Sequence, residues 1–178
     1  VDVIADVLRQ DYSIRNYMVE IGGEVATSGV SVQKQPWQIA IDAPIEDSTV
    51  RERQTIAAIR QPVGSAMHLA TSGNYRNSIT FDGKRYSHTI DPTTGEPIVG
   101  GAPSVTIAAD SVALADAWAT ALTAMPYDKA LMTAKQQNLA ALFVINANKA
   151  DEVGSNRLEN WKMVQTPAMK TLRAGQVD

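Results

Sequence analysis

Ser104–Leu122 reads S-V-T-I-A-A-D-S-V-A-L-A-D-A-W-A-T-A-L and predicts a strand followed directly by a helix. Pro103–Ala108 is apolar and β-branched, which is typical of a strand. Ser111–Met125 is rich in alanine, the strongest helix former, and Pro126 stands beyond its end, where a helix does not continue. We therefore expect a strand at Pro103–Ala108 and a helix at Ser111–Met125.

Strands also dominate the rest of the chain. Asp82-Gly83 is expected to join Ser78–Phe81 to Lys84–His88 in a hairpin, because this pair tolerates positive φ at both central positions. The other predicted strands are Arg15–Ile21, Glu24–Ser28, Trp37–Asp42, Thr55–Gln61, Gly64–Thr71, Leu139–Ile145 and, at an edge of the sheet, Trp161–Thr166.

Two further helices are predicted, one at the beginning of the chain and one at Tyr127–Gln137. The first runs to about Gln10, with Val3, Val7 and Leu8 on one face. Glu46–Gln54 is expected to be an exposed loop, and the tail after Pro167 to be loose. The fold class is α+β, with a mixed or antiparallel sheet and flanking helices.

Composition excludes several kinds of function. The chain has 178 residues and a net charge of -3, so its composition does not indicate the basic surface that nucleic-acid binding needs, although net charge does not report local basic patches. It has no cysteine, which excludes disulfides and thiolate metal sites, and only two histidines, His68 and His88. A bound metal is therefore expected to have oxygen ligands, which favours a hard cation such as Mg²⁺ or Ca²⁺. No run approaches the roughly 20 apolar residues of a membrane span.

Asp116 and Thr120 form a candidate metal-binding pair. They are four residues apart on the predicted helix, so both oxygens lie on one face among small alanine side chains. A cation would remove the cost of burying a lone carboxylate on such a face. On spacing alone, the commoner explanation is an exposed aspartate and a threonine bonded to its preceding helical turn.

His88 and two glycine turns are the other candidate site residues. His88 follows the hairpin and precedes a turn at Asp91-Pro92, where it could act as a general base or bond its own turn. Gly22-Gly23 and Ser72-Gly73 each follow a strand, and glycine there would let backbone amides approach a phosphate. Neither pair matches a known phosphate-binding pattern, so ordinary turns remain the simpler interpretation.

Five segments together resemble the ApbE family of FAD:protein FMN transferases. Their order and spacing agree with the family from Val1 to about Ile145, and several long motifs in order are far more specific than one. The segments are V-E-I-G-G-E (Val19–Glu24), P-W-Q-I-A-I (Pro36–Ile41), A-T-S-G-N-Y-R-N (Ala70–Asn77), G-K-R-Y-S-H-T-I-D-P-T-T-G-E-P (Gly83–Pro97) and Ser104–Leu122.

The resemblance implies an α+β fold related to the T-fold and an enzyme that uses FAD and Mg²⁺. Such an enzyme transfers FMN from FAD to a threonine hydroxyl of a target protein through a phosphoester bond and releases AMP. The alternatives are a Mg²⁺-dependent FAD pyrophosphatase that gives FMN and AMP, or a non-catalytic FAD-binding protein. By the same resemblance, Asp116 and Thr120 are Mg²⁺ ligands, His88 and Ile90 contact FAD, His88 or Asp116 assists catalysis, and Gly22, Gly23, Ser72 and Gly73 line the nucleotide site.

The resemblance also predicts what lies outside these residues. Val1–Arg9 is a helix with no cap residue before it, so we expect 1–178 to be the C-terminal portion of one flavin-transferase domain. The expected partners are the N-terminal half of the same enzyme and an acceptor protein with a threonine-containing flavinylation motif, a subunit of a membrane redox complex. The family also implies an extracytoplasmic lipoprotein, anchored in the inner membrane on its periplasmic side.

Overall fold

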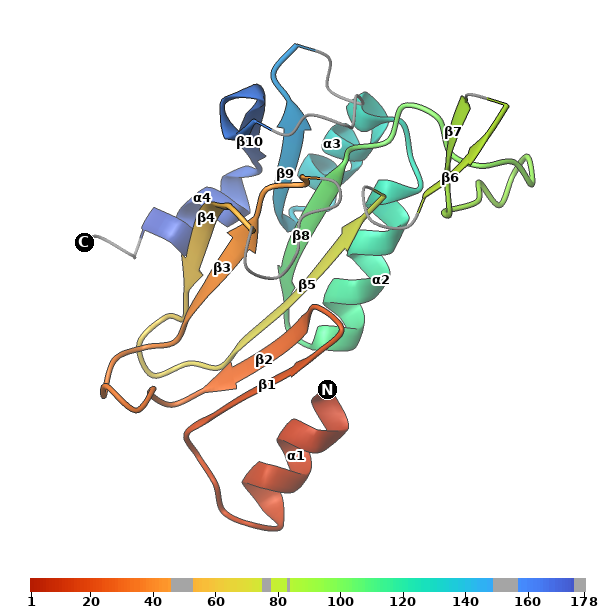
Figure 1. Cartoon of the computed structure of the whole chain (residues 1–178). Helices are drawn as coiled ribbons and strands as arrows, with labels where there is room; N and C mark the ends of the chain where they lie inside the picture. Colours follow the sequence, from red (N-terminus) through yellow and green to blue (C-terminus); the bar gives the residue numbers. More distant parts are fainter. Residues whose placement is uncertain (46–52, 75–77, 83, 149–156, 175–178) are drawn as a thin grey trace.

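A six-stranded antiparallel sheet forms the centre of the computed structural model, which describes residues 1–45, 53–74, 78–82, 84–148 and 157–174 (Figure 1). All five strand pairings in this sheet are antiparallel, in the order β1-β2-β5-β8-β9-β10. Two separate hairpins pair β3 with β4 and β6 with β7. The strands are β1 (Tyr17–Ile21), β2 (Glu24–Ser28), β3 (Gln38–Asp42), β4 (Thr55–Arg60), β5 (Met67–Gly73), β6 (Ser78–Phe81), β7 (Lys84–Ser87), β8 (Ser104–Ala109), β9 (Ala140–Asn146) and β10 (Trp161–Gln165).

Helices cover the sheet on both faces (Figure 1). α2 (Val112–Thr123) and α3 (Tyr127–Gln136) pack on one face, and α4 (Pro167–Ala174) packs with the β3–β4 hairpin on the other. α1 (Asp2–Gln10) lies beside β1 at the sheet edge, and the 3-10 helix η1 (Leu158–Asn160) precedes β10. In the part of the chain that the structure describes, no helix is long and apolar enough to cross a membrane.

The alternation of side chains along β9 explains how the sheet is buried on both faces. Leu142 and Val144 join the core beneath β3 and β4, whereas Phe143 and Ile145 join the core beneath α2 and α3. Successive side chains of a strand point to opposite faces, so a continuous apolar run fits a central strand covered twice. The prediction of a buried strand at Leu139–Ile145 is confirmed.

The prediction of a loose tail after Pro167 is wrong, because residues Pro167–Ala174 form α4. The Thr166 hydroxyl accepts the Ala141 N–H at 3.0 Å and donates to the Leu139 carbonyl at 2.6 Å, which ties the start of the helix to β9. Proline suits the first position of a helix, where its missing N–H has no intrahelical partner. Met169 is fully buried, so the helix is retained by packing as well.

The first helix is present as predicted, but it presents a different face to the protein. Ala5 is its buried residue, whereas Val3 is 76% and Val7 is 38% exposed. The predicted Asp82-Gly83 turn is supported by a φ of 50° at Asp82, while Gly83 lies outside the described residues. Most of the loop predicted at Glu46–Gln54 also lies outside them.

Candidate functional site

α2 carries both residues of the predicted metal-binding pair. Ser111 precedes the helix in an extended conformation, and its Oγ accepts the Leu114 N–H at 3.2 Å. This is the usual N-terminal cap for a helix. Asp116 and Thr120 lie one turn apart along the helix and are both exposed. The expected cost of a buried carboxylate therefore does not arise in this structure.

Ser72 and Thr120 meet across the interface between β5 and α2. Their hydroxyl oxygens are 3.1 Å apart, although they are 48 residues apart in sequence. Side chains alternate along β5, so Ser72 shares the face of Ala70, which packs beneath α2. Within the described residues, the Thr120 hydroxyl thus contacts β5 and has no hydrogen bond to its preceding helical turn. The structure brings a predicted metal ligand and a predicted nucleotide-binding residue together.

Asp116 lines a cavity of about 410 Å³ between α1, the β1–β2 turn and the first turns of α2. Asp2 and Glu24 line the same cavity. Within the described residues, no three histidine, cysteine, aspartate or glutamate side chains are grouped so that they could hold a metal ion. A cation at Asp116 would therefore take its other ligands from hydroxyl or backbone oxygens, as Thr120 and Ser72 could provide.

Two of the predicted nucleotide-lining glycines, Gly23 and Gly73, lie at a cleft on the other face of the sheet. Gly22 and Gly23 form the β1–β2 turn with φ values of 71° and 108°, which glycine adopts without steric cost. The Gly23 N–H donates to Glu20 Oε1 at 3.0 Å. Gly23 and Gly73 line a cleft of about 360 Å³ between β5 and β3. Because Ser72 faces α2, it is separated from Gly23 and Gly73, with which it was predicted to line one site.

His88 and Ile90 lie after the β6–β7 hairpin, which projects beyond the ends of β5 and α2 (Figure 1). His88 is exposed, and within the described residues its ring bonds no group of its own turn. Ile90 is 49% exposed and pairs with Pro97 across an isolated bridge. The structure therefore leaves both side chains accessible, and it places them on a loop rather than on the helix that carries Asp116.

A closed turn supports the loop that follows His88. Gly95 donates its N–H to the Asp91 carbonyl at 2.8 Å, with a φ of 73°. Hydrogen bonds from the Thr93 hydroxyl and N–H hold the pKa of Asp91 below its usual value. The turn predicted from Asp91-Pro92 and Gly95 is confirmed. The loop then reaches the start of α3, since the Gly100 carbonyl accepts the Tyr127 N–H at 2.8 Å.

Asp2 is a site-forming residue that the sequence did not reveal. Its carboxylate accepts the N–H groups of Val112 and Ala113, and 110 residues separate Asp2 from Val112. Partial burial raises the pKa of Asp2, but the hydrogen bonds from Ala113 and Val112 outweigh it and hold the pKa below 3.8. The stabilising contribution of Asp2 is thus complete above pH 3.8 and is lost as the pH falls through the lowered folded-state pKa.

Comparisons with known proteins identify relatives of this chain. The model of the ApbE family matches residues 1–143. An FAD:protein FMN transferase of Vibrio cholerae is 41% identical over 148 residues, which are 83% of this chain and 42% of that protein. The solved structure of the flavin transferase ApbE from the same organism matches this structure with a TM-score of 0.73 and 36% sequence identity. The match covers 96% of this chain and 48% of that protein's chain. The apo form of the flavinyl transferase ApbE from Pseudomonas stutzeri matches with a TM-score of 0.72 and 34% sequence identity. That match covers 97% of this chain and 48% of that protein's chain.

The fold and the matched residues define an α+β protein that is similar to the flavin transferases. The chain belongs to the ApbE family. It spans less than half of the length of the relatives to which it is similar.

Proposed function

We propose that this chain is the C-terminal portion of one FAD:protein FMN transferase domain, which transfers FMN from FAD to a threonine of a target protein. The contact between Ser72 and Thr120 at 3.1 Å, one turn from Asp116, is the observation that carries the proposal. Family membership and the curated names of the relatives support the reaction class. The remainder of the domain would supply the other half of the site.

Asp116, Thr120 and Ser72 are the residues that would hold Mg²⁺. All three supply oxygen, which suits a hard cation, and they project from two rigid elements, α2 and β5. When bound, Mg²⁺ would neutralise charge on the FAD pyrophosphate and on the departing AMP. Asp116 contributes the one formal negative charge in this set, so it should contribute most to cation affinity.

In the proposed reaction, the threonine oxygen of the target forms a bond to the phosphorus of the FMN half. The pyrophosphate bond breaks, and its bridging oxygen leaves with AMP. The threonine proton must pass to a base. His88 is the proposed base because its imidazole is exposed and histidine is the side chain that most often serves as a general base, with Asp116 as the rival. Gly22, Gly23, Gly73 and Ile90 are the proposed FAD contacts.

A flavin-labelling assay distinguishes transfer from the alternatives. The complete protein is incubated with FAD, Mg²⁺ and an acceptor that carries a threonine-containing flavinylation motif. We expect flavin fluorescence that remains on the acceptor after denaturation, together with one AMP released per label. Release of FMN without labelling would instead support an FAD pyrophosphatase. Bound but uncleaved FAD would support a non-catalytic binding protein.

The proposed partner is a subunit of a membrane redox complex, and the proposed location is the periplasmic side of the inner membrane, with a lipid anchor. Both follow from the family resemblance. Cell fractionation with protease treatment of spheroplasts tests the location. Recovery of the complete protein in the cytosolic fraction, protected from protease, would contradict it.

Ser72→Ala is expected to raise the Mg²⁺ concentration for half-maximal FAD cleavage by about tenfold. Loss of a side chain that hydrogen-bonds a metal ligand commonly weakens metal binding by about this factor. The Ser72 hydroxyl belongs to the proposed ligand set and also lies 3.1 Å from the Thr120 hydroxyl, so its loss would affect two oxygens of the site. Ser65→Ala is a suitable control, because Ser65 is an exposed serine in the loop before β5. Equal Mg²⁺ dependence of the two variants would exclude Ser72 from the metal site.

A further inference from the structure

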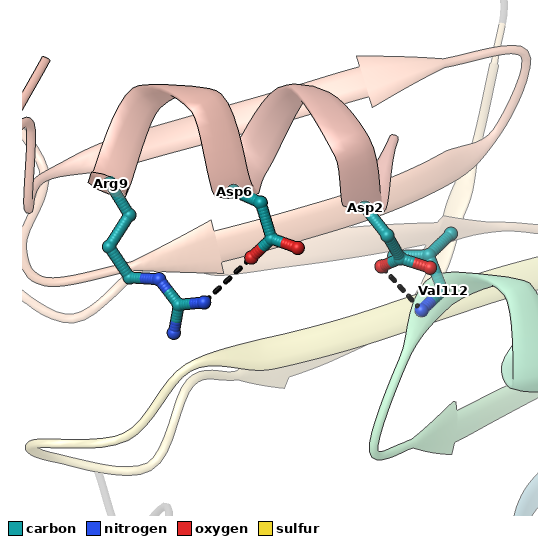
Figure 2. A network of polar contacts seen from close by, with 4 residues as sticks. All are labelled: Asp2, Asp6, Arg9 and Val112. Atoms are coloured by element: carbon teal, nitrogen blue, oxygen red, sulfur yellow. Dashed lines mark hydrogen bonds and ion pairs between the residues drawn. The ribbon is translucent and has the colours of Figure 1, made fainter. Parts of the chain in front are cut away.

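The carboxylate of Asp2 joins α1 to the helix that carries the proposed metal ligands (Figure 2). Asp2 Oδ1 lies 2.9 Å from the Val112 nitrogen, and Oδ2 lies 2.9 Å from the Ala113 nitrogen. Each oxygen therefore accepts one backbone N–H from the first turn of α2. A carboxylate that accepts two such bonds at a helix N-terminus also gains from the helix dipole.

These bonds complete the hydrogen bonding of the first turn of α2. Val112 and Ala113 donate to Asp2, and Leu114 donates to the Ser111 hydroxyl. Ala115 donates to the Ser111 carbonyl as the first regular helical bond. Because the free N–H groups of a helix N-terminus are already satisfied here, this end of α2 has no amide left for an FAD phosphate.

Apolar packing alone holds α1 weakly. Ala5 is its buried side chain and packs with Ala26 of β2 and Val112 of α2. Val3 and Ile4 are 76% and 44% exposed in the same helix. Alanine buries little area, so the two bonds of Asp2 are the main polar link between α1 and α2.

The same link forms one side of the cavity that contains Asp116. Asp2, Val112, Ala113 and Asp116 all line this cavity of about 410 Å³. Asp116 follows Val112 by four residues, so it lies on the same helix face one turn later. A displacement of the first turn would therefore move the Asp116 carboxylate relative to the cavity.

We infer that Asp2 is a positioning residue, which holds the first turn of α2 so that Asp116 is directed at the metal. This inference rests on the metal site proposed above. The positioning role is assigned to Asp2 because each of its oxygens accepts a backbone N–H from the first turn of α2. A residue far from the ligands in sequence thus sets the geometry of the site.

The test compares Asp2→Asn and Asp2→Ala in the complete protein, with Mg²⁺-dependent FAD cleavage as the readout. We expect Asp2→Asn to raise the half-saturating Mg²⁺ concentration about tenfold, and Asp2→Ala to raise it further, since the asparagine oxygen still accepts one N–H. Hydrogen exchange of the peptide that begins α2 should quicken in the same order. Asp6→Asn is the matched control, since Asp6 lies on the same helix and, among the described residues, pairs only with Arg9 at 2.6 Å (Figure 2).

The outcomes separate this inference from the proposed function. A lower melting temperature or a smaller active fraction, with unchanged Mg²⁺ dependence, would show that Asp2 is merely structural and overturn the inference. Unchanged exchange at the start of α2 would overturn it as well. Asp116→Asn serves as the reference. If that variant keeps the wild-type Mg²⁺ dependence, the metal site itself has failed, and the inference fails with it.

Discussion

Asp116→Ala is expected to lower Mg²⁺-dependent FAD cleavage by the complete protein about 100-fold or more. Asp116 is the charged member of the proposed ligand set, and a metal contributes several kcal/mol to stabilising transition-state charge. A loss of about 3 kcal/mol corresponds to about a 100-fold lower rate. The measurement is the initial rate of AMP release over a range of Mg²⁺ concentrations.

Folding should be nearly unaffected by Asp116→Ala, because the side chain is exposed and alanine favours the helix. Asp110→Ala is the matched control, since Asp110 is an exposed aspartate that precedes the same helix. We expect the control to keep its rate and its Mg²⁺ dependence. If Asp116→Ala also cleaves FAD at the wild-type rate, the metal role assigned to α2 is wrong.

Phe143→Ala is expected to lower the free energy of unfolding by about 3 to 5 kcal/mol, the usual cost of removing a large buried side chain. Phe143 is fully buried in β9, where it packs beneath α2 and α3. Its ring lies edge-on to Tyr127, with centroids 5.8 Å apart and an interplanar angle of 81°. The substitution would remove this contact and leave a cavity beneath α2. Urea denaturation of the complete protein measures the change.

Phe81→Ala provides the comparison, because the chain contains only two phenylalanines and Phe81 is 73% exposed in the β6–β7 hairpin. Its effect should stay within about 0.5 kcal/mol, as for most surface substitutions. A difference of less than 1 kcal/mol between the two variants would contradict the core that β9 forms with α2 and α3.

The regular elements followed closely from local sequence. Alternation in β3 and the apolar run of β9 predicted strands, and the alanine-rich segment predicted α2. These signals can be recognised in short stretches of sequence, because a helix or a strand places its core-facing apolar residues at a fixed spacing. The segment after Pro167 is the exception, because the sequence predicts a loose tail there and the structure has the helix α4. The stability of α4 comes from the Thr166 hydroxyl and from the burial of Met169, which local sequence does not show.

The candidate site was predictable residue by residue, but not as an arrangement. Asp116 and Thr120 share a helix face because of their spacing, and the structure agrees. The separation of Ser72 from Gly73 depends on the pleat of β5, which directs neighbouring residues to opposite faces. The sequence of β5 alone does not reveal which of its two faces packs against α2.

By itself, the sequence determined the periodicity of most elements, the family resemblance and the restriction of any metal site to oxygen ligands. The tertiary structure alone decided that Ser72 meets Thr120 and that Asp2 holds the first turn of α2. The reason is physical. Spacing along one helix sets which side chains share a face, whereas contacts across 48 and 110 residues depend on strand register and on how helices pack against the sheet. The helix of Ser104–Leu122 therefore acquires its proposed role from residues that lie far from it in the chain.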